Sequence, residues 1–356
     1  MENKIKAQRV ALEICFQTHK ITGKTRLRVQ VSEEIAAIGH ISLFCKQINI
    51  LAVSLAGTPL SFAAPSSEAW INLLPDVVAG TQAYDKLIQA QAALYEFESS
   101  QGGLLKVVLP LERRYADTVL LDIDFEVTQP AAGLVFYTSK GREFLISDGL
   151  MDTVHCWVPC DDQCASSYPF GVEIIVPKAY TAVASGELAE ICELAGDRKA
   201  YRYQCQDHML IGTFGICVGQ FAAIVPDPNL SWITHFAVSR LDDLRYTVSN
   251  PVFTYANLVS YLGEVTGQDP PFSSQFLVFL PDLPRSLSFT SLALISDTYL
   301  LSPKVLEGQE DTLRTLAWAT AFNWFGGYFT YQTLPDLWMI IALQAYLANI
   351  YYQEKF

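Results

Sequence analysis

Histidine and charge are both scarce in this chain. The 356 residues contain five histidines, none of which follows His235, and Asp336 is the only carboxylate residue between Asp311 and Glu354. Zinc sites are built from histidine, cysteine and carboxylate ligands, which excludes a histidine-based zinc site in the last third of the chain. Charged residues make up 17% of the sequence and hydrophobic residues 51%. This is little charge for a surface that meets only water, and it predicts faces covered by a partner.

Several other functional signals are absent. No Walker A sequence and no G-x-G-x-x-G motif occurs, and the first residues, 1–17, interleave charges with apolar side chains, which predicts no signal peptide. The eight cysteines are therefore expected to be reduced. Residues 315–335 and 337–353 carry no charge, but polar residues, glycines and a proline interrupt the first run and the second is short for a bilayer. We expect two buried helices there and no membrane anchor.

The net charge of −13 argues against nucleic-acid binding driven by the field of the whole molecule. Residues 1–28 are a local exception, with seven basic and two acidic side chains. Lysine and arginine at a solvated strand edge, where they discourage aggregation, explain this stretch best. A weak, salt-sensitive contact with DNA is the alternative.

The hydrophobic pattern predicts an α+β protein with two domains. Residues 26–31 and 121–127 alternate apolar with polar side chains, as half-buried strands do. Such segments, separated by turn residues, predict a β-rich saddle or sandwich domain over residues 1–226. Further strands are expected at residues 133–137, 172–176, 201–205 and 210–218.

Helical signals dominate the second predicted domain, residues 227–356. Asn250 and Pro251 resemble the start of a helix that ends at Gly263. A strand at 276–280 follows, then a helix from about Gln309 that Gly326 and Gly327 end. The last helix begins after Asp336 and is apolar nearly all round, so it is expected to be buried. Its apolar residues include Trp338, Ile341, Leu343, Ala345, Tyr346 and Ile350.

Residues 318–326, WATAFNWFG, keep the frame of a zinc-aminopeptidase helix without its ligands. An H-E-x-x-H motif places two zinc-binding imidazoles one helical turn apart beside a glutamate that acts as general base. Trp318, Ala319 and Phe322 stand at those positions, and Ile341 stands where the third ligand, a glutamate, would follow. We expect Trp318, Phe322 and Ile341 to form an apolar plug in place of the metal.

Motifs along the whole chain carry a resemblance to a family. They are Gln129 to Phe136 (QPAAGLVF), Trp157 to Asp162 (WVPCDD), Val176 to Leu188 (VPKAYTAVASGEL), Gly215 to Phe221 (GICVGQF), Ser260 to Leu262, Pro270 to Phe272 and Phe279 to Asp282. With these motifs the chain resembles the aminopeptidase-like TATA-binding-protein-associated factors of general transcription factor IID, which are catalytically inactive relatives of the M1 aminopeptidases. The aminopeptidase loop G-A-M-E-N would fall near Arg285 to Phe289, where its glycine and its amine-binding glutamate are missing.

The resemblance implies the N-terminal β-rich domain of M1 aminopeptidases followed by a truncated thermolysin-like domain. It implies a nuclear, non-catalytic scaffold in RNA polymerase II preinitiation assembly, with other factor IID subunits as partners and core-promoter DNA contacted through the complex. No catalytic residue, cofactor, metal, small-molecule substrate or membrane is expected. Trp324 to Gly326 and Asp336 to Trp338 are expected to remain because they pack the two helices together. The alternatives are a diverged metallopeptidase and a peptide-binding module.

Three other groups of residues were weighed as sites. His155, Cys156, Cys160 and Cys164 could ligate zinc, but they lie on one short segment stiffened by Pro159, which favours buried thiols in a loop. Gly215 to Gly219 resembles a nucleophile elbow with Cys217 as nucleophile, but the apolar residues that follow predict a strand where an elbow needs a helix. His208 and His235 have no identifiable partner in the sequence.

Overall fold

The computed structural model describes residues 4–65, 103–149, 153–161, 166–227, 230–250, 255–304, 309–329, 331 and 336–355. The chain forms two compact units. One comprises residues 1–134 and 153–162, and the other comprises residues 135–152 and 163–356. The predicted domain boundary after residue 226 falls inside the second unit and stays a prediction.

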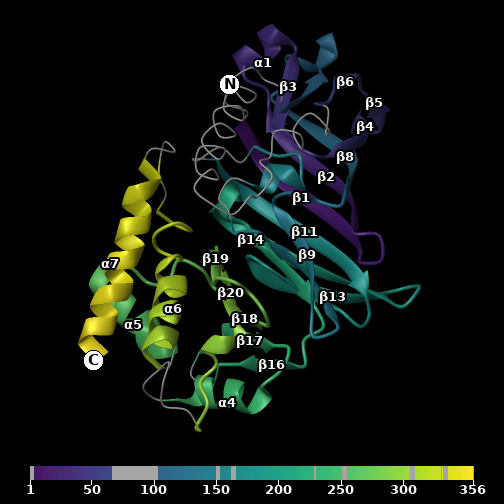
Figure 1. Ribbon diagram of the computed structural model, residues 1–356. Helices are drawn as coiled ribbons and strands as arrows, with labels where there is room; N and C mark the ends of the chain where they lie inside the picture. The colour runs from purple at the N-terminus through teal and green to yellow at the C-terminus, as the bar shows by residue number, and fades with distance from the viewer. Residues whose placement is uncertain are drawn as a thin grey trace, which may run out of the picture. The chain divides into compact units, whose positions relative to one another are not determined.

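Strands prevail up to residue 226, and helices gather toward the C-terminal end (Figure 1). The helices within the described residues are α1 (Glu33–Ile38), α4 (Leu241–Ser249), α5 (Tyr255–Thr266), α6 (Gln309–Ala321) and α7 (Leu337–Lys355). The strands are β1 (Lys4–Cys15), β2 (Lys20–Gln30), β3 (His40–Phe44), β4 (Asn49–Leu55), β5 (Thr58–Pro59), β6 (Phe62–Ala63), β7 (Leu104–Val108), β8 (Thr118–Thr128), β9 (Leu134–Ser139), β10 (Arg142–Ser147), β11 (Ser167–Pro177), β12 (Thr181–Ala184), β13 (Glu187–Leu194), β14 (Arg198–Leu210), β15 (Ile216–Gly219), β16 (Ala223–Pro226), β17 (Ile233–Ala237), β18 (Gln275–Leu280), β19 (Leu287–Phe289) and β20 (Leu292–Ser296).

The first unit contains the antiparallel strands β5, β4, β8, β2 and β1, side by side in that order, and a small sheet of β3, β7 and β6. Buried and exposed residues alternate along β2 and β8, because alternate side chains of a strand point to opposite faces of its sheet. The inward residues, such as Leu27 and Ile123, are fully buried. The alternation noted in the sequence at 26–31 and 121–127 is therefore the half-buried pattern that was predicted.

The basic residues of β2 are paired with carboxylates of β8. Lys20 lies 2.7 Å from Glu126, Lys24 lies 3.1 Å from Asp124, and Arg26 lies 2.6 Å from Asp122. Lys20 lowers the pKa of the Glu126 carboxyl, and Asp122 raises that of Arg26. The sequence suggested that these basic residues protect a strand edge. That suggestion is wrong for β2, because β2 lies between β1 and β8. The paired side chains form a cross-strand ladder of opposite charges, which leaves less free charge for a DNA contact.

Gln47 joins two of the sequence motifs of the first unit by hydrogen bonds. Its side-chain amide donates to the carbonyl oxygens of Ala132, at 2.6 Å, and Cys156, at 2.9 Å, and its Oε1 accepts from the backbone N–H of Ala131 at 2.8 Å. The side chain is buried, so these bonds satisfy groups that water cannot reach. Gln47 therefore ties the QPAAG turn to the WVPC segment.

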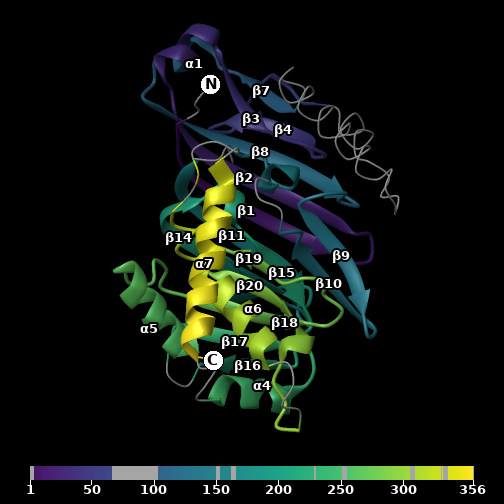
Figure 2. The same cartoon turned by 60° about the vertical axis from the view of Figure 1, so that its left-hand side comes forward.

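The second unit contains β11, β14 and β13, adjacent in that order, a sheet of β12, β15, β10 and β9, and a mixed sheet of β16, β17, β18, β20 and β19. In the mixed sheet the three central strands are parallel. Every residue of β18 and β20 is buried, as expected for parallel strands covered on both faces. Helices α5, α6 and α7 lie together beside this sheet (Figure 2).

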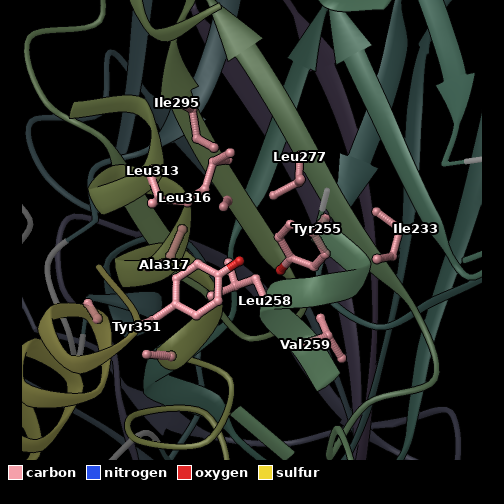
Figure 3. Packing of buried hydrophobic residues seen from close by; sticks show 14 of the residues in the cluster. Ile233, Tyr255, Leu258, Val259, Leu277, Ile295, Leu313, Leu316, Ala317 and Tyr351 are labelled. Carbon is pink, nitrogen blue, oxygen red and sulfur yellow. The ribbon is translucent and has the colours of Figure 1, made fainter. Parts of the chain in front are cut away.

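The helices and one face of the mixed sheet enclose a hydrophobic core. Figure 3 shows residues of this core from α5, α6 and α7 converging on residues of β17, β18 and β20. Tyr351 of α7 is fully buried, and its ring centroid lies 5.1 Å from that of Tyr261 in α5. On the opposite face of the sheet, Phe276 meets Tyr203 of β14 edge to face at 5.8 Å. The labelled residues of the core are Ile233, Tyr255, Leu258, Val259, Leu277, Ile295, Leu313, Leu316, Ala317 and Tyr351.

The predicted α+β class is confirmed, and most predicted elements are present. The predicted strand at 210–218 is only partly right, because a 3-10 turn, Ile211–Thr213, precedes the short β15. Asn250 ends α4, a helix that the sequence did not indicate, and α5 continues past Gly263 to Thr266. No helix within the described ranges is long and apolar enough to cross a bilayer.

Buried tyrosines predict a loss of stability at alkaline pH. Burial raises the pKa of Tyr351 to about 12, and burial with a hydrogen bond to Glu143 raises that of Tyr180 to about 12. Burial also raises the pKa values of Tyr137, Tyr203 and Tyr255. The folded protein thus holds these protons more tightly than the unfolded chain, whose tyrosines titrate near pH 10. Their contribution to stability is complete below about pH 10 and is lost as the pH rises toward about 12.

This prediction can be measured with urea unfolding curves recorded across the alkaline range. The urea midpoint is expected to be constant below about pH 10 and to fall steeply above it. Tyrosinate absorbance should rise in two steps, the second together with unfolding. A single step near pH 10 in protein that is still folded would contradict the burial of these hydroxyls.

Candidate functional site

Helix α6 ends just before Phe322, the residue that the sequence analysis placed at the second histidine of a zinc motif. The helix runs from Gln309 to Ala321, and Phe322 begins a turn in which the N–H of Trp324 donates to the Ala321 carbonyl at 3.1 Å. Gly326 has a φ of +128°, and a Cβ there would lie 2.7 Å from the Phe322 ring. The ring of Phe322 therefore packs directly on the Gly326 backbone. The glycines were expected to end the helix, but the chain leaves it five residues before Gly326.

The four positions of the zinc motif have different environments. Ala319 and Phe322 are buried, with 2% and 6% of their surface exposed, whereas Trp318 is 36% exposed and Ile341 is 44% exposed. Two exposed side chains cannot form a closed apolar plug with Phe322, so that prediction is wrong. An indole, a methyl, a phenyl and a butyl group also offer no metal ligand and no general base.

Hydrogen bonds and an aromatic contact connect α6 to α7 where the plug was expected. The side-chain amide of Gln344 donates to the Trp318 carbonyl at 2.9 Å, and Gln344 is buried. Farther along, the Tyr352 hydroxyl donates to Glu310 at 2.7 Å, and the Arg314 guanidinium lies 4.1 Å from the centre of the Tyr352 ring. Of the predicted packing residues, Trp324 is buried, but Trp338 is 69% exposed and does not pack the helices together.

The segment at the position of the amine-binding loop is filled by apolar packing. Leu287 and Phe289 lie on β19 and are buried. A Cβ on Gly215 would come within 2.3 Å of the Phe289 ring, and one on Gly149 within 2.6 Å of the Leu287 side chain. Phe289 is the last residue of this segment, and its ring rests on the backbone of Gly215. The segment that the sequence analysis placed at the amine-binding loop therefore makes a buried hydrophobic contact.

Asn323 connects the end of α6 to this segment, a role that the sequence analysis missed. Its Oδ1 accepts from the backbone N–H of Ser291 at 3.1 Å, and its Nδ2 donates to Oε1 of Gln275 at 2.8 Å. Ser291 Oγ in turn accepts from the N–H of Gly186 at 2.7 Å. All three side chains are buried, so the network stabilises these loops in one arrangement. An asparagine within an apolar run, noted only as an interruption, was the available signal.

The cysteine and histidine cluster of the first unit lies in a packed loop. His155 and Cys156 belong to a buried 3-10 turn, and the His155 ring lies 5.9 Å from the ring of Phe44. Cys160 is fully buried and its backbone bridges to Phe44. Cys164 lies outside the described residues. Within the described ranges, no group of three or more histidine, cysteine or acidic residues is arranged to hold a metal ion.

The remaining two candidates have structural environments. Cys217 lies on β15 and is fully buried, and burial raises the pKa of its thiol. Strand β16 follows and no helix does, so a nucleophile elbow is not formed. His235 does have a neighbour, contrary to the sequence analysis. Its Nε2 lies 4.0 Å from Oδ2 of Asp227, and both side chains are buried. The side chain of His208 lies outside the part of the chain whose side chains the structure describes.

No family model matches the chain, but individual proteins do. It is 22% identical over 358 residues to transcription initiation factor TFIID subunit 2 of Gallus gallus, covering 96% of this chain and 30% of that protein. The subunit of Drosophila melanogaster is 25% identical over 280 residues, covering 74% and 23%, and that of Schizosaccharomyces pombe is 22% identical over 426 residues, covering 98% and 35%. The chain thus spans roughly a quarter to a third of the length of these relatives.

A solved structure agrees in fold over nearly the whole chain. Yeast LTA4 hydrolase in complex with bestatin superposes with a TM-score of 0.72 at 15% sequence identity, covering 97% of this chain and 48% of that one. The leukotriene A-4 hydrolase of Xenopus laevis is 20% identical over 355 residues, covering 96% and 50%. The N-terminal sheets, the mixed sheet and its helices therefore have an LTA4 hydrolase-like fold. The chain is thus similar in sequence to TFIID subunit 2 and has the fold of LTA4 hydrolase.

Proposed function

We propose that the chain is a non-catalytic scaffold subunit of transcription factor IID that acts in the nucleus during assembly of the RNA polymerase II preinitiation complex. The similarity to TFIID subunit 2 across 96% to 98% of the chain in two of the relatives carries the proposal. The partners proposed are other subunits of factor IID. Core-promoter DNA is contacted through the complex, since the basic residues of β2 are already paired with β8.

The side chains at the aminopeptidase positions support a role without catalysis. To hydrolyse a peptide, a zinc enzyme needs three protein ligands for the metal and a general base. An exopeptidase also needs a carboxylate that binds the free amine of the substrate. Trp318, Ala319, Phe322 and Ile341 supply neither ligand nor base, and the segment Arg285 to Phe289 contains no carboxylate. The diverged metallopeptidase is the weaker alternative for this reason.

The purified protein is therefore expected to contain no stoichiometric zinc and to cleave no aminoacyl substrate. Metal content measured by atomic emission and hydrolysis of fluorogenic aminoacyl amides, with and without a chelator, test this. An authentic M1 aminopeptidase assayed in parallel serves as the positive control. About one zinc per chain together with chelator-sensitive hydrolysis would refute the non-enzyme proposal.

The scaffold role is tested by affinity purification from nuclei followed by mass spectrometry. A tagged full chain is expected to recover other factor IID subunits. The zinc and hydrolysis assays use purified protein and need no partner. A negative result in the affinity purification would therefore leave the outcome of those assays unaffected. Recovery of no transcription subunit, from nuclei in which the tagged chain is present and folded, would refute the scaffold role.

A further inference from the structure

A hollow of about 200 Å³ opens beside the start of β13, within the second unit. Strand residues form one side of it, and the loop that precedes β18 forms the other. Hydroxyl, amide and carboxylate groups share its wall with the ring of Phe272. The lining residues used below are Glu187, Gln204, Phe272, Ser273 and Ser274.

Hydrogen bonds and a steric constraint hold the hollow in shape. Ser274 Oγ donates to the carbonyl of Gly186 at 2.7 Å, and Ser273 Oγ donates to the carboxylate of Glu187. Gly186 has a φ of +93°, and a Cβ there would lie 2.7 Å from the carbonyl oxygen of Gln204. The strand ends and the loop are thereby fixed against each other. A ligand would enter a site that is largely formed beforehand, which lowers the cost of binding.

The carboxylate in the hollow has no basic partner among the described residues. Strand β13 carries three glutamates, and two of them are compensated. Glu190 lies 2.6 Å from Arg202, and Glu193 lies 3.2 Å from Lys178. Among the residues that the structure describes, Glu187 accepts from the Ser273 hydroxyl alone. The hollow therefore holds a half-buried negative charge beside an aromatic ring, a combination that attracts ammonium and guanidinium groups.

Strand β13 also has a free edge. In the described part of the chain it pairs with β14 and with no other strand. Its sequence, ELAEICEL, contains no proline and no lysine, and of the features that commonly block such edges it has one irregularity in its pairing with β14, between Leu188 and Glu190. Leu188, Ile191 and Leu194 are all exposed on it. An extended peptide can add to an edge of this kind through backbone hydrogen bonds.

We propose that β13 accepts an extended segment of a polypeptide partner as an added strand, with a lysine or arginine of that segment placed in the hollow against Glu187. A residue directly opposite Glu187 on an added strand would have its Cβ about 5 Å away, within reach of the carboxylate. The apolar residues of the segment would cover Leu188 and Ile191. This inference goes beyond the scaffold role and does not depend on it.

The test uses the full chain and short fluorescent peptides that alternate threonine and valine around one central residue. That residue is lysine in one peptide and norleucine in the other. Fluorescence anisotropy is expected to show about tenfold tighter binding of the lysine peptide, the factor that one charge-assisted hydrogen bond of modest strength supplies. Equal affinities for the two peptides would overturn the proposal.

Matched variants separate the hollow from the rest of the strand. Glu187→Gln should remove the preference for lysine, whereas Glu190→Gln on the same strand should retain it. Ile191→Lys should weaken the binding of both peptides, because it places a positive charge on the edge. Unchanged thermal unfolding of each variant checks that it is folded. A lysine preference that persists in Glu187→Gln, or peptide binding that is insensitive to Ile191→Lys, would overturn the assignment.

Discussion

Replacing Phe322 with alanine is expected to lower the free energy of unfolding by about 3–5 kcal/mol, the usual cost of removing a buried phenyl ring. The ring is 6% exposed and packs on the backbone of Gly326, where the chain turns out of α6. Its loss would open a cavity at the junction that also places Asn323 in its hydrogen bonds. The turn would then lose the packing of the ring, and Asn323 would no longer be held in place for its hydrogen bonds.

The same substitution at Trp318 is expected to cost less than at Phe322, because the indole keeps 36% of its surface in solvent and the Phe322 ring only 6%. The Trp318 carbonyl accepts from the Gln344 amide and from the N–H of Phe322, and Trp318→Ala keeps both bonds. Guanidinium unfolding of both variants measures the difference, with the exposed Phe329→Ala as a control for removal of a phenyl ring. If both variants lost an equally large free energy of unfolding, the result would contradict the structure and support an apolar plug formed by Trp318 and Phe322.

The contrast between these two residues shows what the sequence could predict here. The helix expected from about Gln309 is present as α6, and its buried residues Leu313, Leu316 and Ala317 have the spacing of one helix face, a pattern that can be read locally from the sequence. The same spacing could not show that Trp318 points to solvent, because the side of α6 covered by α7 depends on residues far along the chain. The helix end was also misplaced. Local glycine signals pointed to Gly326, but packing of Phe322 and the bonds of Asn323 end the helix earlier.

Contacts between strands that are far apart in the sequence could not be predicted either. Seven basic residues near the N-terminus suggested an electropositive stretch. The carboxylates that neutralise three of them lie on β8, about a hundred positions later, in register only once the sheet is formed. The alternation within β2 and β8 was readable because it is local. The Asp227 and His235 pair was missed although the residues are close in sequence, since only pairing of β16 with β17 brings them together.

Helix α7 presents an apolar face to solvent, which agrees with the prediction of faces that a partner covers, although the helix as a whole was expected to be buried. Trp338 is 69% exposed and Tyr346 is 62% exposed, and Met339, Ile341 and Leu343 between them are exposed as well. No charged residue occurs between positions 337 and 353. Periodicity could not distinguish this face from the buried one, because the helix is apolar all round. Exposed apolar areas of this kind usually mark binding surfaces.

The isolated chain is therefore expected to bind a hydrophobic dye and to self-associate as its concentration rises. The triple variant Trp338→Glu, Ile341→Lys and Tyr346→Glu should suppress both effects without lowering stability, because these side chains are exposed. Leu111→Glu with Tyr115→Glu, two exposed apolar residues of the other unit, is the control and should change neither. Dye fluorescence and sedimentation velocity provide the readouts. If the chain is a factor IID scaffold, co-expression with neighbouring subunits should also reduce dye binding. Wild-type protein that stays monomeric without binding dye would show that this face does not act as a docking surface.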